Sequence, residues 1–366
     1  MGDKKNGDQK RIGILTSGGD CSGLNAVIRA VVRRAIGGYG WRLFGIREGT
    51  MGLLRRPLDY EELTLKIFTG NVLRMGGTIL GAMSAGDPFA FPMPDGSVKD
   101  RSNEIIEGYR ELGLDALVVI GGDGSLRITQ ALAEKGNLNV VAIPKTIDND
   151  IGLTETCIGY NTAVCVATEA LDRLQPTAAS HNRVIILEVM GRDAGHIALG
   201  SGIAGGADVI LIPEIPYRME NVTAKIASLR SQGRSHALIV VAEAVKTESG
   251  ETVGVRKKSG GVRYGGIGHY LGDRISELTG DETRVTILGH LQRGGTPTPR
   301  DRLMASVFGV HAVDLIAKGR FGHMVAWQNR RVVDFPIREV LEHYCGVDPE
   351  GALAKTARGL GISFGD

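Results

Sequence analysis

Short apolar runs rich in β-branched residues recur along the chain, each followed by a Gly- and Asp-rich loop and then by a helical pattern. In the first copy, residues 12–16 (Ile-Gly-Ile-Leu-Thr) lead into Ser-Gly-Gly-Asp at 17–20. After this loop, apolar side chains recur with the helical period and share one face, at Val27, Ile28, Val31, Val32 and Ala35. This order predicts a β-loop-α unit.

A second copy runs from residues 115–120 through Gly-Gly-Asp-Gly-Ser at 121–125 into a helical stretch at 126–135. We expect Ser125 to cap this helix and Gly136 to end it. Further buried strands are predicted at 140–143, 184–189, 209–212, 237–242 and 285–288, with helical patterns at 162–174 and 221–232. Continuous apolar strands alternating with helices predict an α/β fold with doubly wound, mainly parallel sheets.

The length of 366 residues suits two domains, since domains usually have about 100 to 200 residues. A net charge of +2 gives no reason to expect a nucleic-acid partner. No apolar run approaches the roughly 20 residues that cross a bilayer, and the polar N-terminus does not resemble a signal peptide. We therefore expect a cytoplasmic protein that does not enter a membrane, with residues 1–10 disordered.

Two polar stretches, residues 86–100 and 246–264, are expected to be surface excursions because they are rich in turn residues. The cysteines are scattered without C-x-x-C spacing, at Cys21, Cys157, Cys165 and Cys345. This spacing predicts reduced thiols rather than a disulfide framework or a zinc site.

The two glycine-rich loops follow buried strands, at the edge where open α/β sheets bind ligands. Loops 17–20 and 121–125 supply backbone N–H groups near helix N-termini, where partial positive charge favours phosphate. The chain has neither the G-x-x-x-x-G-K-[ST] pattern nor a G-x-G-x-x-G that opens a helix. A P-loop and the standard dinucleotide fold are therefore disfavoured.

Residues 144–150, Pro-Lys-Thr-Ile-Asp-Asn-Asp, place two carboxylates beside a Lys and a Thr directly after a predicted strand. Phosphoryl transfer needs a metal, a group that orients or deprotonates the nucleophile, and a cation near the transferring oxygens. This heptapeptide can supply all three, although an Asx-rich turn is the alternative interpretation. Basic residues recur beside later strands, and we expect four arginines and two histidines to converge on a sugar phosphate: Arg183, Arg192, Arg284, Arg293, His181 and His290.

Together these motifs resemble the phosphofructokinase A family. The matching segments are Leu-Thr-Ser-Gly-Gly-Asp at 15–20, Gly-Gly-Asp-Gly-Ser at 121–125, Pro-Lys-Thr-Ile-Asp-Asn-Asp at 144–150, Met-Gly-Arg at 190–192 and Leu-Gly-His-Leu-Gln-Arg-Gly-Gly at 288–295. They follow the family's order over about residues 11–335. A Gly-Gly-Asp-Gly loop alone would not distinguish the family from NAD kinases and lipid kinases, whereas the other motifs do.

The resemblance implies two similar lobes with the active site in the cleft between them. It also implies magnesium-dependent transfer of the γ-phosphoryl group of ATP to the 1-hydroxyl of fructose 6-phosphate. Residues 11–158 and 292–342 would form the donor lobe, and residues 159–291 and 343–366 the sugar-phosphate lobe.

The resemblance assigns catalysis to three residues. Asp148 is expected to take the proton of the 1-hydroxyl as general base, Thr146 to contact the transferring phosphate, and Arg192 to lie near the transition state. The heptapeptide itself suggests Lys145 as a fourth catalytic residue, the cation near the transferring oxygens. For the donor, the implied phosphate cradle consists of Gly19, Gly122, Gly124 and Ser125, and the implied magnesium-binding residues are Asp123 and Asp150.

For the acceptor, the resemblance implies that Met190 and Gly191 line the sugar and that Glu243 holds its hydroxyls. The residues implied in the 6-phosphate clamp are Arg183, Arg284, His290 and Arg293. In the family the equivalents of Arg183 and Arg284 come from a neighbouring subunit. The resemblance therefore implies a homo-oligomer, a dimer or tetramer, with shared sugar-phosphate sites.

The sequence departs from the family's pattern at positions that bear on the donor. Lys145 replaces the Gly of bacterial ATP-dependent enzymes and matches pyrophosphate-dependent members, which usually carry Asp in place of Gly124. A carboxylate there would repel the α-phosphate of a nucleotide, so the retained Gly124 favours ATP. Ser84 stands where many relatives have a phosphate-contacting arginine. Pyrophosphate as donor, a non-catalytic nucleotide-sensing subunit and a kinase of another acceptor such as NAD remain alternatives.

Overall fold

The computed structural model describes residues 9–68, 70–83, 86–256 and 262–366 of the chain. The chain divides into two compact units. Unit 1 contains residues 1–146, 151–159 and 293–344, and unit 2 contains residues 147–150, 160–292 and 345–366. The lobe limits expected from the sequence differ most at residues 147–150, which belong to unit 2 rather than to the first lobe.

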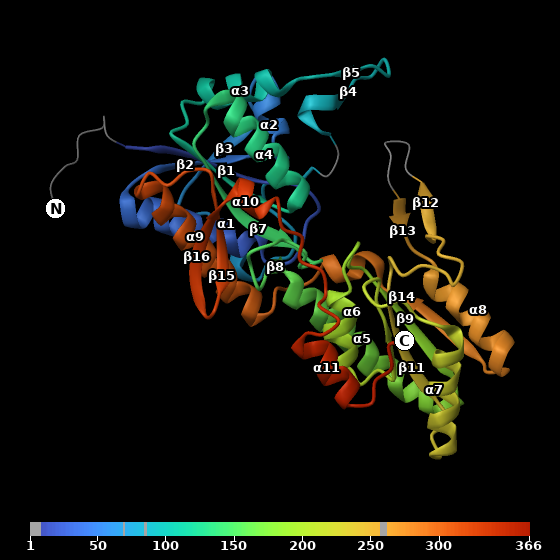
Figure 1. Ribbon diagram of the computed structural model, residues 1–366. Helices are drawn as coiled ribbons and strands as arrows, with labels where there is room; N and C mark the ends of the chain where they lie inside the picture. Colours follow the sequence, from blue (N-terminus) through green and yellow to red (C-terminus); the bar gives the residue numbers. More distant parts are fainter. Residues whose placement is uncertain (1–8, 69, 84–85, 257–261) are drawn as a thin grey trace. The chain divides into compact units, whose positions relative to one another are not determined.

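The main sheet of unit 1 has the order β16-β15-β7-β6-β1-β2-β3, with β8 paired to β7 (Figure 1). β1, β2, β6, β7, β8 and β15 run parallel, whereas β3 and β16 are antiparallel to their neighbours at the two ends. The strands are β1 (Arg11–Thr16), β2 (Arg42–Ile46), β3 (Tyr60–Leu63), β6 (Ala116–Gly121), β7 (Val140–Thr146), β8 (Ile158–Gly159), β15 (His323–Gln328) and β16 (Arg331–Pro336).

Helices and short turns complete unit 1. They are α1 (Leu24–Val32), the π-helical η1 (Arg33–Gly38), α2 (Met51–Leu54), η2 (Asn71–Arg74), η3 (Pro88–Ala90), α3 (Ser102–Glu111), α4 (Asp123–Gly136), α9 (Pro299–Ala317) and α10 (Ile337–Val340). The core joins Leu15 and Phe44 of the sheet to Ile105, Tyr109 and Leu126 of α3 and α4. The β-branched and apolar runs seen in the sequence are thus the buried strands of this core.

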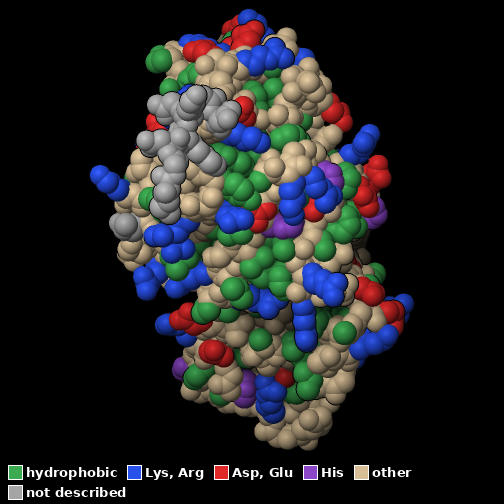
Figure 2. Space-filling view, turned by 90° about the vertical axis from the view of Figure 1, so that its left-hand side faces the viewer, with side chains coloured by type: hydrophobic (Ala, Val, Ile, Leu, Met, Phe, Trp, Pro, Cys, Tyr) green, Lys and Arg blue, Asp and Glu red, His purple; other side chains and the backbone are tan. Residues whose placement is uncertain are grey.

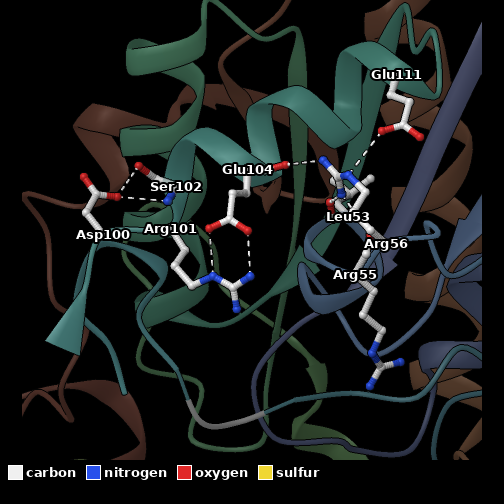
Figure 3. A network of polar contacts seen from close by, with 8 residues as sticks. All are labelled: Leu53, Arg55, Arg56, Asp100, Arg101, Ser102, Glu104 and Glu111. Atoms are coloured by element: carbon white, nitrogen blue, oxygen red, sulfur yellow. Dashed lines mark hydrogen bonds and ion pairs between the residues drawn. The ribbon is translucent and has the colours of Figure 1, made fainter. Parts of the chain in front are cut away.

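The polar stretch before α3 forms η3 and the short hairpin β4 (Phe91–Pro92) and β5 (Val98–Lys99). A network of polar contacts ties its end to α3 (Figure 3). Asp100 accepts hydrogen bonds from the backbone nitrogen and hydroxyl of Ser102, and Arg101 forms a two-pronged pair with Glu104 at 2.8 and 2.6 Å. Hydrogen bonds from Ser102 and Lys135 lower the pKa of Asp100 to about 2. The stretch expected as a surface excursion is therefore anchored where it meets the helix.

The central sheet of unit 2 has the order β10-β11-β9-β14, and all its strands are parallel. The strands are β9 (Val184–Val189), β10 (Val209–Leu211), β11 (Ala237–Ala242) and β14 (Thr283–Ile287). Every residue of β9 and β11 is buried, so both faces of these strands are covered. The helices are α5 (Tyr160–His181), α6 (His196–Ala204), α7 (Met219–Ser231), α8 (Ile267–Thr279) and α11 (Ala352–Gly359).

Two further features of unit 2 bear on the candidate site. The polar stretch after β11 contains the antiparallel strands β12 (Gly254–Arg256) and β13 (Val262–Tyr264). The 3-10 helix η4 (Gly289–Arg293) follows β14 and reaches the boundary between the units at Arg293.

The fold class predicted from the sequence is confirmed, but some local expectations are wrong. Ser125 lies inside α4, whose N-cap is Gly122, because the helix begins three residues earlier than its apolar pattern. Gly136 is the last helical residue, and Asn137 ends α4 in a left-handed conformation with φ 50°. Lys10 is ordered, since its carbonyl accepts a hydrogen bond from Arg42 and its ammonium lies over the Trp41 ring. The rest of the expected disordered N-terminus, up to residue 8, lies outside the described residues.

No helix in the described part of the chain is long and apolar enough to span a bilayer. On the face shown in Figure 2, Lys and Arg side chains are interspersed with acidic and hydrophobic ones. This mixture agrees with the net charge of +2.

Candidate functional site

The two glycine-rich loops of unit 1 lie next to each other because β1 and β6 are adjacent parallel strands. The backbone nitrogen of Ser17 donates to the carbonyl of Ile120 at 2.9 Å, and the hydroxyl of Ser125 donates to that of Ser17 at 2.9 Å. The loops after both strands therefore form one surface of backbone groups at the carboxyl edge of the sheet. Such a surface suits phosphate oxygens.

Glycine is required at one position of this loop and is unhindered at another. A Cβ on Gly121 would lie 2.5 Å from the Cβ of Ser125, so any larger residue would push the loop away from α4. A Cβ on Gly124 would meet no atom within 4 Å. Gly124 thus faces open space in the first turn of a 14-residue helix, where a ligand can approach the backbone.

Asp123 begins α4 and carries the expected metal-binding carboxylate of unit 1. Its Oδ2 accepts from Nε of Arg127 at 3.1 Å, and its side chain is 40% exposed. Within the described residues, no group of three or more His, Cys, Asp and Glu side chains is placed to hold a metal ion. Magnesium commonly keeps several waters and uses one or two carboxylates together with substrate phosphates. Asp123 therefore fits a magnesium ion that arrives with a nucleotide.

Lys145 is buried, with 4% of its surface exposed, near the end of β7. Its ammonium donates to the carbonyl oxygen of Gly19, and a Cβ on Gly18 would lie 3.4 Å from it. Lys145 thus joins the end of β7 to the loop after β1. Thr146, the last residue of β7, is half-buried.

Arg293, the last residue of η4, belongs to unit 1. Its Nη1 donates to the carbonyl of Asp20 at 3.0 Å, and a Cβ on Gly19 would lie 2.6 Å from the same nitrogen. The structure therefore brings Arg293 together with the first glycine-rich loop.

The two carboxylates of the acidic heptapeptide belong to unit 2, and each residue is 8% exposed. Between them Asn149 has φ 56°, a left-handed conformation that Asn tolerates well. The carbonyl of Asp150 accepts from the backbone nitrogen of Cys345 at 3.0 Å. Asp148 and Asp150 are therefore held in a fixed, buried turn rather than in an exposed loop.

The Met-Gly-Arg loop follows β9 and is held at several points. The backbone nitrogen of Met190 donates to Oε1 of Gln292 at 2.8 Å, and that of Arg192 donates to Oε1 of Glu243 at 3.0 Å. Arg192 has φ 51°, so this loop turns sharply and leaves its guanidinium exposed. Glu243 and the Met190–Arg192 loop lie together because β9 and β11 are parallel neighbours.

Glu243, a candidate site residue of unit 2, has a shifted pKa. Burial raises the pKa of its carboxyl, hydrogen bonds from the backbone of Arg192 and Gly191 oppose the rise, and the nearby charge of Asp148 adds to it. The effect of the Asp148 charge on Glu243 shows that these two carboxylates of unit 2 lie near each other. His290, on η4, is exposed.

Arg183 and Arg284 lie at the opposite end of the same sheet. Arg183 precedes β9, and Arg284 is the second residue of β14, paired in register with Ile185. Glu282 joins them, with Oε2 2.8 Å from Nε of Arg183 and Oε1 paired with Arg284. β9 has six residues and so spans roughly 20 Å. Within this chain, Arg183 and Arg284 therefore lie at the amino ends of strands whose carboxyl ends lead to Arg192 and His290.

Sequence reasoning missed several residues that support this site: Gln292, Asp193, Tyr264 and Glu188. Glu188 could have been found, because a carboxylate inside the apolar run 184–189 must have partners if it is buried. Asp193 and Tyr264 carried no comparable signal. The Ser84 position noted in the sequence lies outside the described residues.

Comparisons with known proteins give the chain's relationships. Residues 11–316 match the family described as phosphofructokinase. The chain is 59% identical over 360 residues to a Synechocystis sp. protein named ATP-dependent 6-phosphofructokinase 1, an alignment that covers 98% of this chain and 99% of the relative. A Nostoc sp. protein of the same name is 61% identical over 357 residues, with 98% and 99% covered.

A solved structure supports the same relationship. The phosphofructokinase of Saccharomyces cerevisiae superposes with a TM-score of 0.79 at 30% identity, covering 98% of this chain and 48% of that one. Match, identity and fold agree over nearly the whole sequence. This chain therefore belongs to the phosphofructokinase family.

Proposed function

We propose that this chain is an ATP-dependent 6-phosphofructokinase, which transfers the γ-phosphoryl group of ATP to the 1-hydroxyl of fructose 6-phosphate and yields fructose 1,6-bisphosphate. The proposal rests on the functional groups found in each of the two units. Unit 1 has a glycine-lined helix N-terminus with the buried Lys145, and unit 2 has the buried Asp148 close to Glu243 and the Arg192 loop. Relatives at 59% and 61% identity carry the name of this activity.

Donor binding is assigned to unit 1. Backbone N–H groups of the two loops would meet the phosphates, using Gly19, Gly122, Gly124 and Ser125, and Thr146 would contact the phosphoryl group in transfer. Magnesium, when bound, neutralises charge on the phosphate oxygens. Asp123 and Asp150 are the oxygen ligands we propose for it.

Asp148 is assigned as the general base. Its carboxylate would accept the proton of the 1-hydroxyl as the hydroxyl oxygen attacks the phosphorus, and the bond from phosphorus to the leaving oxygen of ADP breaks. An ordinary Asp is a weak base at neutral pH, so its position matters more than its basicity. Arg192 and Lys145 would stabilise the negative charge of the transferring group.

Sugar phosphate is assigned mainly to unit 2. Met190 and Gly191 would line the sugar, Glu243 would accept from its hydroxyls, and His290 with Arg293 would contact the 6-phosphate. Arg183 and Arg284 lie a strand length away from Arg192, so we propose that they serve the site of a neighbouring subunit. This arrangement requires a homo-oligomer, a dimer or tetramer.

ATP is the proposed donor because a Cβ on Gly124 would meet no atom within 4 Å, and this empty space leaves room for the α-phosphate. Pyrophosphate is the competing donor, since Lys145 matches enzymes that use it. Purified protein assayed with fructose 6-phosphate and each donor separates the two. Faster turnover with pyrophosphate would reverse the assignment, and no product with either donor would favour a nucleotide-sensing subunit. We further propose a cytoplasmic location and an active site in the cleft between the two lobes.

A further inference from the structure

Tyr264, the last residue of β13, makes a contact that the mechanism above does not use. Its hydroxyl donates to Oδ1 of Asp193, a residue 71 positions earlier that immediately follows Arg192. The hydrogen bond with Asp193 and burial raise the pKa of Tyr264 to about 12. The hydroxyl therefore keeps its proton, and remains a donor, at any pH at which an enzyme of this kind works.

The Asp193 carboxylate is shared between two partners. While Oδ1 accepts from Tyr264, Oδ2 lies 3.6 Å from Nε of Arg192. A close guanidinium–carboxylate pair has N···O distances of about 2.7 to 2.9 Å. Asp193 therefore lies beside Arg192 without binding it closely.

The segment that follows Tyr264 is anchored by the buried carboxylate of Glu188. Glu188 is 1% exposed, and its carboxylate accepts from the backbone nitrogen of Gly266 at 2.9 and 3.1 Å and from that of Gly268 at 2.8 Å. Gly266 has φ 102°, a conformation in which a side chain would be strained. The chain directly after Tyr264 is thus tied to β9, the strand that leads into the Arg192 loop.

We propose that Tyr264 is a positioning residue that holds the Asp193 carboxylate away from the Arg192 guanidinium, so that Arg192 stays free to meet the transferring phosphoryl group. The inference rests on the proposed function, in which Arg192 acts at the transition state. Glu243 already fixes the backbone of Arg192, and so the remaining freedom is that of its side chain. The Asp193 carboxylate is the anion that would compete with phosphate for the Arg192 guanidinium.

Loss of the tyrosine hydroxyl removes one of the two partners of Asp193. The carboxylate is then free to rotate and form a close pair with Arg192, and that pair must break before the guanidinium reaches phosphate. Because this competing pair must break before the transition state forms, Tyr264→Phe should lower kcat roughly tenfold. KM for fructose 6-phosphate should change by less than about twofold, because the competing pair acts on transition-state stabilisation.

The test is a double-mutant cycle with Tyr264→Phe, Asp193→Asn and the double variant, measured as kcat and KM with fructose 6-phosphate and ATP. The uncharged amide introduced by Asp193→Asn cannot sequester Arg192, so Tyr264→Phe should change kcat less than about twofold in that background. Tyr270→Phe is the matched control, because Tyr270 is also half-buried and its hydroxyl donates to a carboxylate, that of Glu248, at 3.2 Å. The control should leave kcat unchanged.

Three results would overturn the inference: wild-type kcat in Tyr264→Phe, a tenfold loss in both backgrounds, or an equal loss in Tyr270→Phe. Thermal melting of each variant shows whether a loss reflects unfolding, and the cycle is then read at a temperature where all variants are folded. If the wild-type protein forms no fructose 1,6-bisphosphate, the proposed function fails and this inference fails with it. If the wild type is active and the cycle is additive, only the role of Tyr264 is wrong.

Discussion

The ammonium group of Lys145 donates a hydrogen bond to the backbone carbonyl oxygen of Gly19. This contact links the end of β7 to the loop after β1, two strands that are separated by β6 in the sheet. The buried ammonium group of Lys145 therefore contacts the loop that we assign to the donor phosphates. From this position we expect Lys145 to contribute to charge stabilisation with ATP and with pyrophosphate alike.

Lys145→Met keeps the length of the side chain and removes its charge. We expect kcat to fall by about 10² with ATP, because removing one preorganised donor at a developing charge typically costs about 10²- to 10³-fold. Lys225→Met is the control, since the half-buried Lys225 also donates to a backbone carbonyl, that of Gly361, at 2.8 Å. Steady-state assays on both variants check this, and unchanged turnover in Lys145→Met would reduce the lysine to a structural link.

Asp148→Asn replaces the proposed base with an amide of the same shape. Because base catalysis typically contributes about 10²- to 10⁴-fold, we expect kcat to fall by that factor. Affinity for fructose 6-phosphate, measured by calorimetry, should stay within a few fold, since the amide still fits the buried turn. Full activity in this variant would remove Asp148 from the proton-transfer step.

Gly124→Asp tests the choice of donor. The added Cβ meets no atom within 4 Å, so the protein should fold normally, while the carboxylate repels the nucleotide's α-phosphate. We expect KM for ATP to rise at least tenfold, with pyrophosphate less affected. Gly124→Ala adds only the Cβ and should keep the ATP affinity of the wild type. Equal loss in the Ala and Asp variants would show that steric crowding, not charge, decides.

Glu243 should make activity depend on pH on the acid side. Burial raises its pKa above the ordinary 4.5, so the carboxylate that we propose accepts from sugar hydroxyls is protonated at a pH where an exposed Glu is still charged. We therefore expect kcat/KM to fall as pH decreases through this raised pKa, and Glu243→Gln to flatten that limb. An unchanged acid limb in the variant would assign it to another group.

Stability should respond to Glu243 in the opposite direction. The Glu243 carboxyl binds its proton more tightly in the folded protein than in the unfolded chain. Protonation of Glu243 therefore stabilises the folded state below the ordinary pKa of Glu, and this stabilisation is lost as the pH rises through the raised pKa. Thermal melts of wild type and Glu243→Gln over this window should diverge as pH rises, with the wild type losing stability relative to the variant.

The sequence predicted the fold well where burial alone decides. Residues 184–189 and 237–242 are continuous apolar runs, and they form the fully buried strands β9 and β11 with the expected limits. Ends of elements were less predictable, because they depend on backbone geometry. α4 begins at Asp123, ahead of its apolar pattern, since the turn of Gly121 and Gly122 determines where the helix starts.

For the candidate site, the order of the strands determines which residues could be predicted to lie close together. Ser17 and Ser125 come together because β1 and β6 are neighbours, which two similar motifs already suggested. Arg183 precedes the predicted strand 184–189 and Arg192 follows it, so their separation could be read from the sequence, whereas the pairing of β14 with β9 that brings Arg284 near Arg183 could not. The contact between Tyr264 and Asp193 joins residues 71 positions apart, and no local sequence pattern predicts such a contact.

The division of the chain falls inside the acidic heptapeptide, between Thr146 and Ile147. Thr146 ends a strand of unit 1, whereas Asp148 belongs to unit 2, and two residues of extended chain reach at most about 7 Å. Covalent bonds therefore tether the proposed phosphate contact to the proposed base. The Cα atoms of Thr146 and Asp148 therefore stay within this distance of each other in every arrangement of the two units.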